Sequence, residues 1–246
     1  MPIIFLSPST QDWNQYVTGS GSEEYHMNLI ADAMEPYLLA NGIRWTRNDP
    51  AGTAGSAIRQ ANSGYYDLYL ALHSNAAPEG RYGEERGIIA FYYPTSAQGR
   101  RFAELIVEQL RDIYPLPDKV TARSITTLGE VRLSRFPAVL VEIGYHDNYA
   151  DAVWVETHTE AIAQQLARAV TEYFGLPFAY PMEPSAGTVR VNFGTLNLRA
   201  RPDRTADVIA NMPDGARVMV YGEWQGWYTV HYGGLIGYAA AAFIDT

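Results

Sequence analysis

The hydrophobic pattern divides the chain into two parts of different character. In the first part, short apolar runs typical of strands alternate with longer segments whose apolar residues recur every three or four positions, as in helices. The predicted strands cover residues 3–6, 43–46, 67–72, 87–93 and 138–143. The predicted helices cover residues 23–41, 56–62, 97–113 and 151–174. This alternation predicts an α/β fold with a mixed sheet flanked by helices.

The pattern changes after Phe174. Residues 177–187 are rich in proline and glycine, as is typical of a linker, and frequent turn signals separate short apolar runs from Thr188 onward. No helical period is present there, which predicts a small all-β barrel of roughly sixty residues. We therefore expect an α/β domain over residues 1–176, the linker, and the barrel over residues 188–246.

Charge and composition narrow the range of partners. The chain has 246 residues, a formal net charge of −9 and a pI of about 5.0. Because nucleic-acid binding needs a basic surface, this balance argues against a nucleic-acid partner. Cysteine is absent, which excludes disulfides, zinc–thiolate sites and thiol nucleophiles. Any bound metal must therefore use histidine, carboxylate or amide-oxygen ligands.

The start of the chain and the length of its apolar runs bear on its location. The first residues, Met1-Pro2-Ile3-Ile4-Phe5, lead directly into a predicted strand, with no basic segment and long apolar stretch before them. A secretory signal is therefore not expected, although a chain trimmed of its leader would look the same. No apolar run approaches the ~20 residues of a membrane span.

Three side chains with metal-binding or acid–base chemistry lie at the ends of predicted elements. Glu24 stands in the first turn of the helix predicted over residues 23–41, while His73 and Glu142 each end an apolar strand. In α/β folds, ligands and chemistry lie at such strand ends. Carboxylate and imidazole groups can hold a zinc ion and act on its water, so the sequence favours a zinc hydrolase.

The C-terminal part resembles a bacterial SH3 (SH3b) domain. The motifs that carry the resemblance are Thr195-Leu196-Asn197-Leu198-Arg199-Ala200-Arg201-Pro202, Gly215-Ala216-Arg217-Val218, Gly226-Trp227-Tyr228-Thr229-Val230 and Gly237-Tyr238-Ala239. Members of this family commonly attach enzymes to bacterial cell walls. The resemblance therefore implies a wall-targeting module with peptidoglycan as its partner.

The first part resembles the zinc-dependent N-acetylmuramoyl-L-alanine amidases of the amidase-3 type. The matching motifs are Glu24 with Asn28, followed by Gly42 and Thr46-Arg47, then Leu72-His73-Ser74-Asn75, and finally residues 137–145 with Asn148. The resemblance implies hydrolysis of the amide between N-acetylmuramic acid and the L-alanine of the stem peptide. It also implies that Glu24 and His73 bind Zn²⁺ and that Glu142 is the catalytic acid–base.

One zinc ligand of that family is missing from this sequence. The first strand of the family ends in Asp-Pro-Gly-His, whereas this chain reads Ser7-Pro8-Ser9-Thr10, which places Thr10 where the ligand histidine is expected. His146 follows Glu142 at the same strand end and is the preferred substitute. The other candidates are His26, Gln11 and Asp12. A metal held by two protein ligands and waters, or no metal at all, are the remaining alternatives.

The expected chemistry gives the remaining polar residues their roles. Zinc polarises the scissile carbonyl and lowers the pKa of its bound water toward ~7. Glu142 then takes the proton of that water and delivers it to the leaving nitrogen. We expect Asn75 and Asn148 to orient substrate amides and Arg132 to bind a carboxylate of the stem peptide.

Two other functions are compatible with the same residues. One is a cell-wall-binding or regulatory protein that lost catalytic activity together with the first histidine. The other is a zinc peptidase that cuts stem peptides or crossbridges. The amidase is the preferred hypothesis, acting as a monomer at the bacterial cell wall. Without a secretory signal, it would fit an endolysin released by lysis.

Overall fold

The computed structural model describes residues 1–246, and its internal contacts divide the chain into two compact units. The larger unit comprises residues 3–34 and 45–173. The smaller unit comprises residues 1–2, 35–44 and 174–246. This division differs from the predicted one because residues 35–44, which lie early in the chain, group with the C-terminal part.

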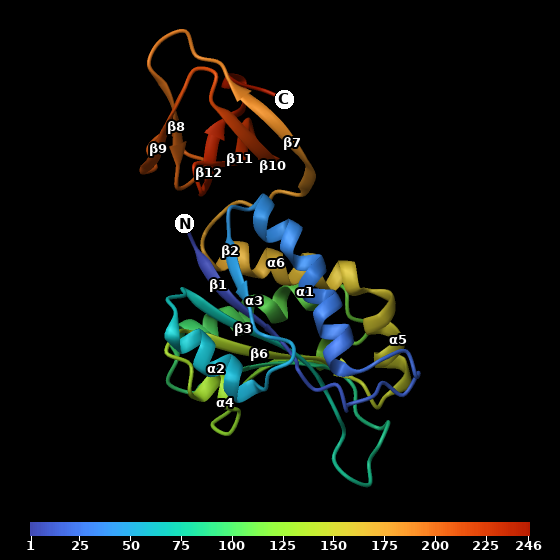
Figure 1. The fold of residues 1–246 in the computed structure, drawn as a ribbon. Helices are drawn as coiled ribbons and strands as arrows, with labels where there is room; N and C mark the ends of the chain where they lie inside the picture. Colours follow the sequence, from blue (N-terminus) through green and yellow to red (C-terminus); the bar gives the residue numbers. More distant parts are fainter. The chain divides into compact units, whose positions relative to one another are not determined.

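The larger unit is built around a six-stranded sheet with the order β2-β1-β3-β6-β4-β5 (Figure 1). The strands are β1 (Ile3–Pro8), β2 (Arg44–Arg47), β3 (Leu68–Asn75), β4 (Ile88–Tyr92), β5 (Val120–Ser124) and β6 (Ala138–Tyr145). The helices are α1 (Glu23–Ala40), α2 (Ala54–Ser63), α3 (Ala97–Arg111), α4 (Gly129–Arg132), α5 (Tyr149–Thr157) and α6 (Thr159–Tyr173). Strands β1, β3 and β6 are parallel, and β4 runs antiparallel to β6. The predicted mixed α/β fold is confirmed.

Alternation along the central strands sends successive side chains to opposite faces of the sheet. On one face, Phe5, Tyr69 and Leu140 pack with apolar residues of α2 and α4. The remaining helices cover the opposite face (Figure 1). Toward the carboxyl ends of β1, β3 and β6, the positions on the α2–α4 face become polar: Ser7, His73 and Glu142. The fold therefore brings these three side chains to one edge of the sheet.

Three elements differ from the sequence prediction. Strand β5 and helix α4 were not predicted, and α4 has only four residues, too few to display a helical period. The single helix predicted over residues 151–174 is two helices, α5 and α6, separated at His158. Of these elements, helix α4 lies at the cavity described below, because it carries Glu130.

A bulge interrupts β6 beside this polar edge. His73 pairs with Glu142, whereas Asn75 pairs with Tyr145, so β6 has one residue more than β3 over this stretch. Gly144 lies in the bulge with a φ of 72°, and a Cβ atom there would lie 3.3 Å from Cγ2 of Val155. Glycine adopts this left-handed conformation without strain, which accommodates the bulge two residues after Glu142.

The smaller unit contains a seven-stranded antiparallel sheet with the order β13-β7-β10-β11-β12-β8-β9. Its strands are β7 (Pro181–Val189), β8 (Thr195–Arg199), β9 (Val208–Pro213), β10 (Arg217–Trp224), β11 (Trp227–Tyr232), β12 (Leu235–Ala240) and β13 (Ile244–Asp245). Leu198, Val220 and Val230 lie in its apolar core. The all-β prediction is confirmed. Residues 181–187, expected to be linker, belong to β7, which pairs with β10 and β13.

Buried hydrogen bonds explain why residues 35–44 group with this unit. The Thr229 hydroxyl donates to the carbonyl of Ala40 at 2.6 Å, and the Tyr238 hydroxyl donates to the carbonyl of Asn41 at 2.6 Å. Both carbonyls lie at the C-terminal end of α1, where helix carbonyls lack partners within the helix. None of the helices in the chain has the length and apolar character needed to cross a membrane.

Candidate functional site

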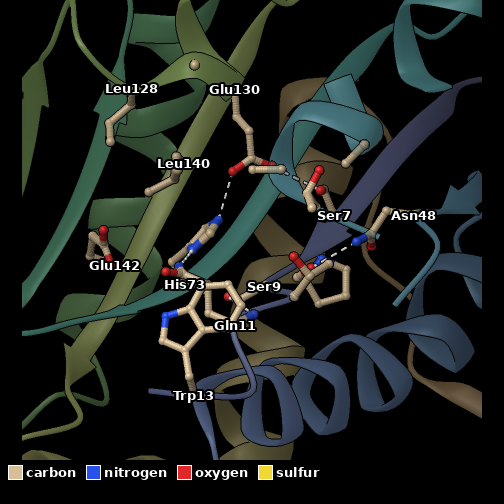
Figure 2. Close-up of a pocket in the computed structure, with 16 residues that line it drawn as sticks. Ser7, Ser9, Gln11, Trp13, Asn48, His73, Leu128, Glu130, Leu140 and Glu142 are labelled. Carbon is tan, nitrogen blue, oxygen red and sulfur yellow. Dashed lines mark hydrogen bonds and ion pairs between the residues drawn. The ribbon is translucent and has the colours of Figure 1, made fainter. Parts of the chain in front are cut away.

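A cavity of about 310 Å³ lies at the polar edge of the sheet in the larger unit (Figure 2). We call it the site cavity. Its polar lining residues are Ser7, Ser9, Thr10, Gln11, Asn48, Thr53, His73, Glu130 and Glu142. Trp13 also lines it and is 67% exposed, so this indole faces both the cavity and solvent.

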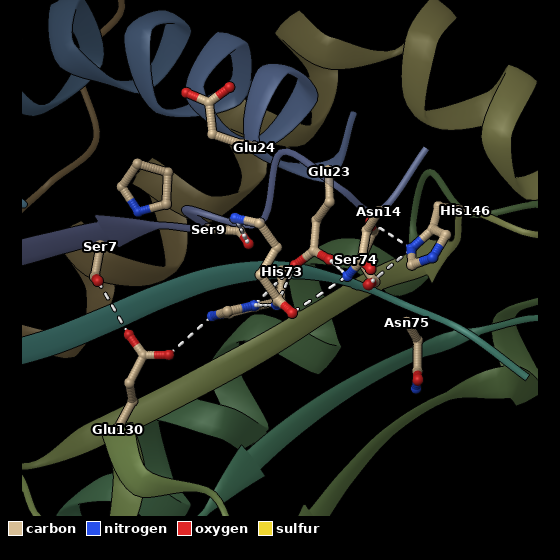
Figure 3. A network of polar contacts seen from close by, with 12 residues as sticks. Ser7, Ser9, Asn14, Glu23, Glu24, His73, Ser74, Asn75, Glu130 and His146 are labelled. Atoms are coloured by element: carbon tan, nitrogen blue, oxygen red, sulfur yellow. Dashed lines mark hydrogen bonds and ion pairs between the residues drawn. The ribbon is translucent and has the colours of Figure 1, made fainter. Parts of the chain in front are cut away.

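His73 is held between two buried carboxylates (Figure 3). Its Nδ1 atom lies 2.9 Å from Oε1 of Glu23, and its Nε2 atom lies 2.8 Å from Oε2 of Glu130. The side chains of all three residues are at most 10% exposed. We call these three residues the carboxylate–histidine network. It joins α1, β3 and α4, and two of its members, His73 and Glu130, line the site cavity.

The periodicity of α1 explains why Glu23, and not Glu24, meets His73. Glu23 lies four residues before Met27 and seven before Ile30, both fully buried, so it belongs to the buried stripe of the helix. Glu24 is rotated about 100° around the helix axis from that stripe. Its Oε1 accepts a hydrogen bond from Asn28 at 3.1 Å, and it points away from the network (Figure 3).

The matched motif around Glu24 therefore forms a different set of contacts from those expected. Asn28 accepts a hydrogen bond from Nη2 of Arg47 at 2.6 Å, and Arg47 also forms an ion pair with Asp32 at 2.8 Å. Glu24 lines a second hollow, which it shares with Thr10 and Trp13. The structure does not bring Glu24 together with His73.

Glu130 is a buried residue of the candidate site that the sequence analysis did not identify. Its Oε1 accepts hydrogen bonds from the Tyr69 hydroxyl at 2.7 Å and from the Ser7 hydroxyl at 3.0 Å, while Oε2 faces His73. Glu130 is 4% exposed. A charged residue buried in a four-residue helix gives no periodic signal, so only the packing of α4 against the sheet reveals it.

The charges of the network stabilise one another. Burial alone would lower the pKa of His73, but the nearby Glu130 carboxylate and the hydrogen bonds to Glu130 and Glu23 raise that pKa well above its usual value. Burial would raise the pKa values of Glu23 and Glu130, but the interactions with His73 hold both below the usual range. The three groups are therefore charged together near neutral pH.

Glu142 faces the same cavity but remains outside the network. Its Oε2 atom is buried and has no hydrogen-bond partner. Burial raises the pKa of Glu142 to about 7, the positive His73 opposes this shift, and the carboxylates of Glu23 and Glu130 add to it. A carboxyl group with this pKa exchanges a proton near neutral pH, as a general acid–base requires.

His146 lies on the other side of β3 from His73. Its Nδ1 atom is 3.1 Å from the Ser74 hydroxyl, and its ring stacks on Tyr16 with centroids 5.9 Å apart. His73 and Ser74 are consecutive strand residues, so their side chains point to opposite faces of the sheet. The structure therefore does not bring His146 and His73 to a common site.

The three predicted substrate-binding residues do not line the site cavity. Asn75 ends β3 and accepts a hydrogen bond from the backbone of Ala76. Asn148 is the N-cap of α5, where its side chain accepts hydrogen bonds from the backbone of residues 150 and 151. Arg132 is exposed at the end of α4. The capping role of Asn148 explains an asparagine at that position without a ligand.

The side chains present do not fit a catalytic zinc ion. Such a site uses about three protein ligands. Of the predicted ligands, only His73 lies in the site cavity, and both of its ring nitrogens face carboxylates. Thr10 is uncharged, and no group of three or more histidine, cysteine, aspartate or glutamate side chains is arranged to hold a metal.

Comparison with known families gives two matches. Residues 10–172 match the family described as N-acetylmuramoyl-L-alanine amidase, and residues 194–245 match the family described as bacterial SH3 domain. No curated protein matches the chain. The first match covers more than half of the 246 residues and includes Glu23, His73, Glu130 and Glu142.

Solved structures share the fold of the larger unit. The amidase AmiC2 of Nostoc punctiforme superposes with a TM-score of 0.62 at 16% identity, covering 70% of this chain and 97% of that one. The catalytic domain of the amidase CwlV from Bacillus (Paenibacillus) polymyxa gives 0.60 at 17%, covering 71% and 98%. The catalytic domain of the CD27L endolysin, which targets Clostridia difficile, gives 0.54 at 21%, covering 70% and 97%. At these identities the likeness establishes the fold.

Proposed function

Because this chain belongs to the N-acetylmuramoyl-L-alanine amidase family, we propose that it acts on bacterial peptidoglycan at the amide between the muramic acid lactyl group and the first alanine of the stem peptide. Its smaller unit matches the bacterial SH3 family and serves to hold the protein at the cell wall. Attachment to the polymer would raise the local concentration of the site cavity at its substrate.

One observation carries the hydrolytic part of this proposal. Glu142 presents a buried carboxylate oxygen without a partner to the site cavity, and its pKa is about 7. In its ionised form the group can take a proton from an attacking water molecule. It can then deliver that proton to the leaving alanine nitrogen, because an acid–base with a pKa near the ambient pH works in both directions.

The expected rate enhancement can be estimated from the catalytic groups that line the site cavity. General acid–base catalysis contributes about 10²–10⁴-fold, and a well-placed hydrogen-bond donor to the oxyanion contributes about 10²–10³-fold. The Thr10 hydroxyl and the Gln11 amide line the cavity and can serve as such donors. Their combined effect lies near the lower end of the ~10⁶–10¹⁷-fold range of enzymes. We therefore expect slow turnover.

The surroundings of Glu142 suit a sugar–peptide junction. Trp13 offers an exposed indole face at the mouth of the cavity, and aromatic faces pack well on sugars and peptide stems. In the smaller unit, a separate hollow of about 370 Å³ is lined by Asn197, Arg199, Trp227 and Phe243. This mixture of aromatic and polar side chains is the candidate surface for wall attachment.

A second candidate function is peptidoglycan binding without hydrolysis. The observation that favours it is the carboxylate–histidine network, since both ring nitrogens of His73 are engaged and no second histidine lies in the cavity. In this case the amidase fold would recognise the muramoyl–alanine junction and the SH3 unit would anchor the protein. The two candidates predict the same binding but different products.

The test is digestion of purified cell-wall sacculi with the full chain, followed by separation of the soluble products and mass spectrometry. Amidase action frees glycan strands with intact lactyl groups and stem peptides that begin with alanine. New amines elsewhere in the stem peptide would indicate a peptidase instead. Sacculus pull-down in the same experiment measures binding independently of cleavage.

Variants make this test specific. Glu142→Gln should abolish product release and retain binding to sacculi. Glu108→Gln is the matched control, because it changes an exposed carboxylate on α3 far from the site cavity in sequence. Release of the same products by Glu142→Gln would exclude the proposed role of this residue. Binding without any product from the unmodified chain would favour the second candidate.

A further inference from the structure

We propose that the site cavity works without a resident zinc ion, because the carboxylate–histidine network of Glu23, His73 and Glu130 takes up the ligand atoms that the metal would need. This inference concerns the metal alone. It holds or fails independently of whether the chain hydrolyses peptidoglycan or only binds it.

The geometry around His73 leaves neither ring nitrogen free for a metal. A histidine binds zinc through a ring nitrogen that carries a lone pair and no hydrogen. Here Glu23 and Glu130 meet the two ring nitrogens at 2.9 Å and 2.8 Å. Ionised carboxylates only accept hydrogen bonds, so each nitrogen must carry a hydrogen and donate it. Neither nitrogen then has a lone pair for a metal.

Both carboxylates of the network also have other hydrogen-bond donors. Glu23 also accepts from the Asn14 side chain at 2.7 Å and from the Gln11 side chain at 3.3 Å. Glu130 also accepts from Tyr69 and Ser7. No side-chain oxygen or nitrogen of the network is buried without a partner. A metal ion would therefore have to break existing hydrogen bonds of these carboxylates, because none of their oxygens is buried without a partner.

Two buried carboxylates need a compensating positive charge, because isolated buried charges are strongly unfavourable. A zinc ion would supply two positive charges, and the doubly protonated His73 supplies one. That single charge lies between the two carboxylates and is close to both of them. The remaining excess of one negative charge is consistent with Glu142, the neighbouring carboxyl, retaining its proton up to neutral pH.

The site also lacks a third side chain that could bind zinc. Thr10 offers a neutral hydroxyl where the sequence resemblance leads one to expect a histidine. Glu24 bonds to Asn28, and His146 bonds to Ser74 on the opposite face of β3. Even if His73 released one hydrogen, only one carboxylate would stand beside the freed nitrogen as a second strong ligand: Glu23 at Nδ1 or Glu130 at Nε2. Two such ligands fall short of the three that catalytic zinc sites use.

The experiment measures metal binding directly on the full chain. The purified protein is treated with EDTA, incubated with excess ZnSO₄, desalted, and analysed for zinc by mass spectrometry. A protein of known zinc stoichiometry serves as the standard. We expect zinc well below one ion per chain. We also expect the thermal unfolding midpoint to be the same with EDTA and with Zn²⁺, because an ion that binds the native state would raise it.

Two variants test whether the network takes the structural place of a metal. His73→Gln should lower the unfolding midpoint by roughly 10 °C, because it leaves two buried carboxylates without their positive partner. Glu108→Gln, on the surface of α3, should leave the midpoint unchanged. If His73→Gln does not fold, the zinc content of the unmodified chain still decides the matter.

The proposal would be overturned by about one zinc ion per chain that raises the unfolding midpoint and is lost in Glu23→Gln or in Glu130→Gln. Zinc that binds substoichiometrically, or that is retained equally by both variants, would lie outside the network and support the proposal. The effect of EDTA on product release gives an independent reading. Hydrolysis that persists in EDTA supports a metal-free site, whereas absent hydrolysis bears only on the proposed function.

Discussion

His73 on β3 and Glu142 on β6 are direct partners in the parallel pairing of the two strands. Paired residues of neighbouring strands point to the same face, so both side chains enter the site cavity. The pairing places the Glu142 carboxyl group, whose pKa is raised, beside the positively charged imidazole of His73. The charge of His73 is already balanced by the carboxylates of Glu23 and Glu130. Glu142 is consequently the group in the cavity that changes charge near pH 7.

The first prediction concerns the pH dependence of product release. Glu142 must be ionised to take a proton from water, and its pKa is about 7. The rate should therefore rise about tenfold per pH unit below pH 7 and level off above it. Initial rates of peptide release from sacculi between pH 5 and pH 9 would measure this profile. A flat profile across pH 7 would contradict the assignment of Glu142.

The second prediction concerns the effect of Glu142 on the pH dependence of the unfolding free energy. The pKa of Glu142 is raised on folding, so the folded state holds its proton more tightly and the unfolding free energy falls as the pH rises from about 4.5 to about 7. The loss is on the order of 3 kcal/mol. Glu142→Gln removes this term, so it should stabilise the protein more at pH 8 than at pH 5. Urea unfolding of both proteins at the two pH values checks the sign.

The third prediction separates two neighbouring glutamates. Glu23→Gln breaks a buried ion pair and should lower the unfolding free energy by about 3 kcal/mol. Glu24→Gln changes a partly exposed residue outside the network and should alter it by about 0.5 kcal/mol or less. Urea unfolding at pH 7 gives both values. Equal losses in the two variants would contradict the separation of Glu24 from the network.

The fourth prediction addresses His146. In the structure its ring bonds to Ser74 and stacks on Tyr16. His146→Ala should therefore destabilise the fold by about 1–2 kcal/mol through the lost hydrogen bond and packing. It should leave the zinc content unchanged. Metal analysis of the variant beside the unmodified chain tests this, and a loss of bound zinc would restore His146 as the substitute ligand.

The fifth prediction concerns Trp13. Its indole is largely exposed and lines the site cavity, so Trp13→Ala should weaken binding of a soluble muropeptide by roughly fivefold, about 1 kcal/mol. Stability should change little, because few contacts are lost. Tyr65→Ala provides the control, since Tyr65 is 83% exposed and does not line the cavity. Titration calorimetry of both variants would show equal affinities if Trp13 had no part in binding.

Much of the fold could be read from the sequence because it depends on local periodicity. The strand-like runs that become β1, β3 and β6 and the helical spacing of α1 and α3 each repeat often enough to be recognised. The change to short apolar runs after Phe174 likewise predicted the all-β unit. Local patterns did not predict that β7 extends into the expected linker. That extent depends on the pairing of β7 with β10 and β13.

Some residues of the candidate site could likewise be predicted from the sequence, and others could not. The sequence by itself placed His73 and Glu142 at strand ends and marked the loss of a histidine at Thr10. Only the tertiary structure decided which carboxylates meet His73. Glu23 reaches it because of the rotation of α1 against the sheet, and Glu130 reaches it because a four-residue helix packs over β3 and β6. These contacts join residues 50 and 57 positions apart, a separation over which sequence periodicity carries no information.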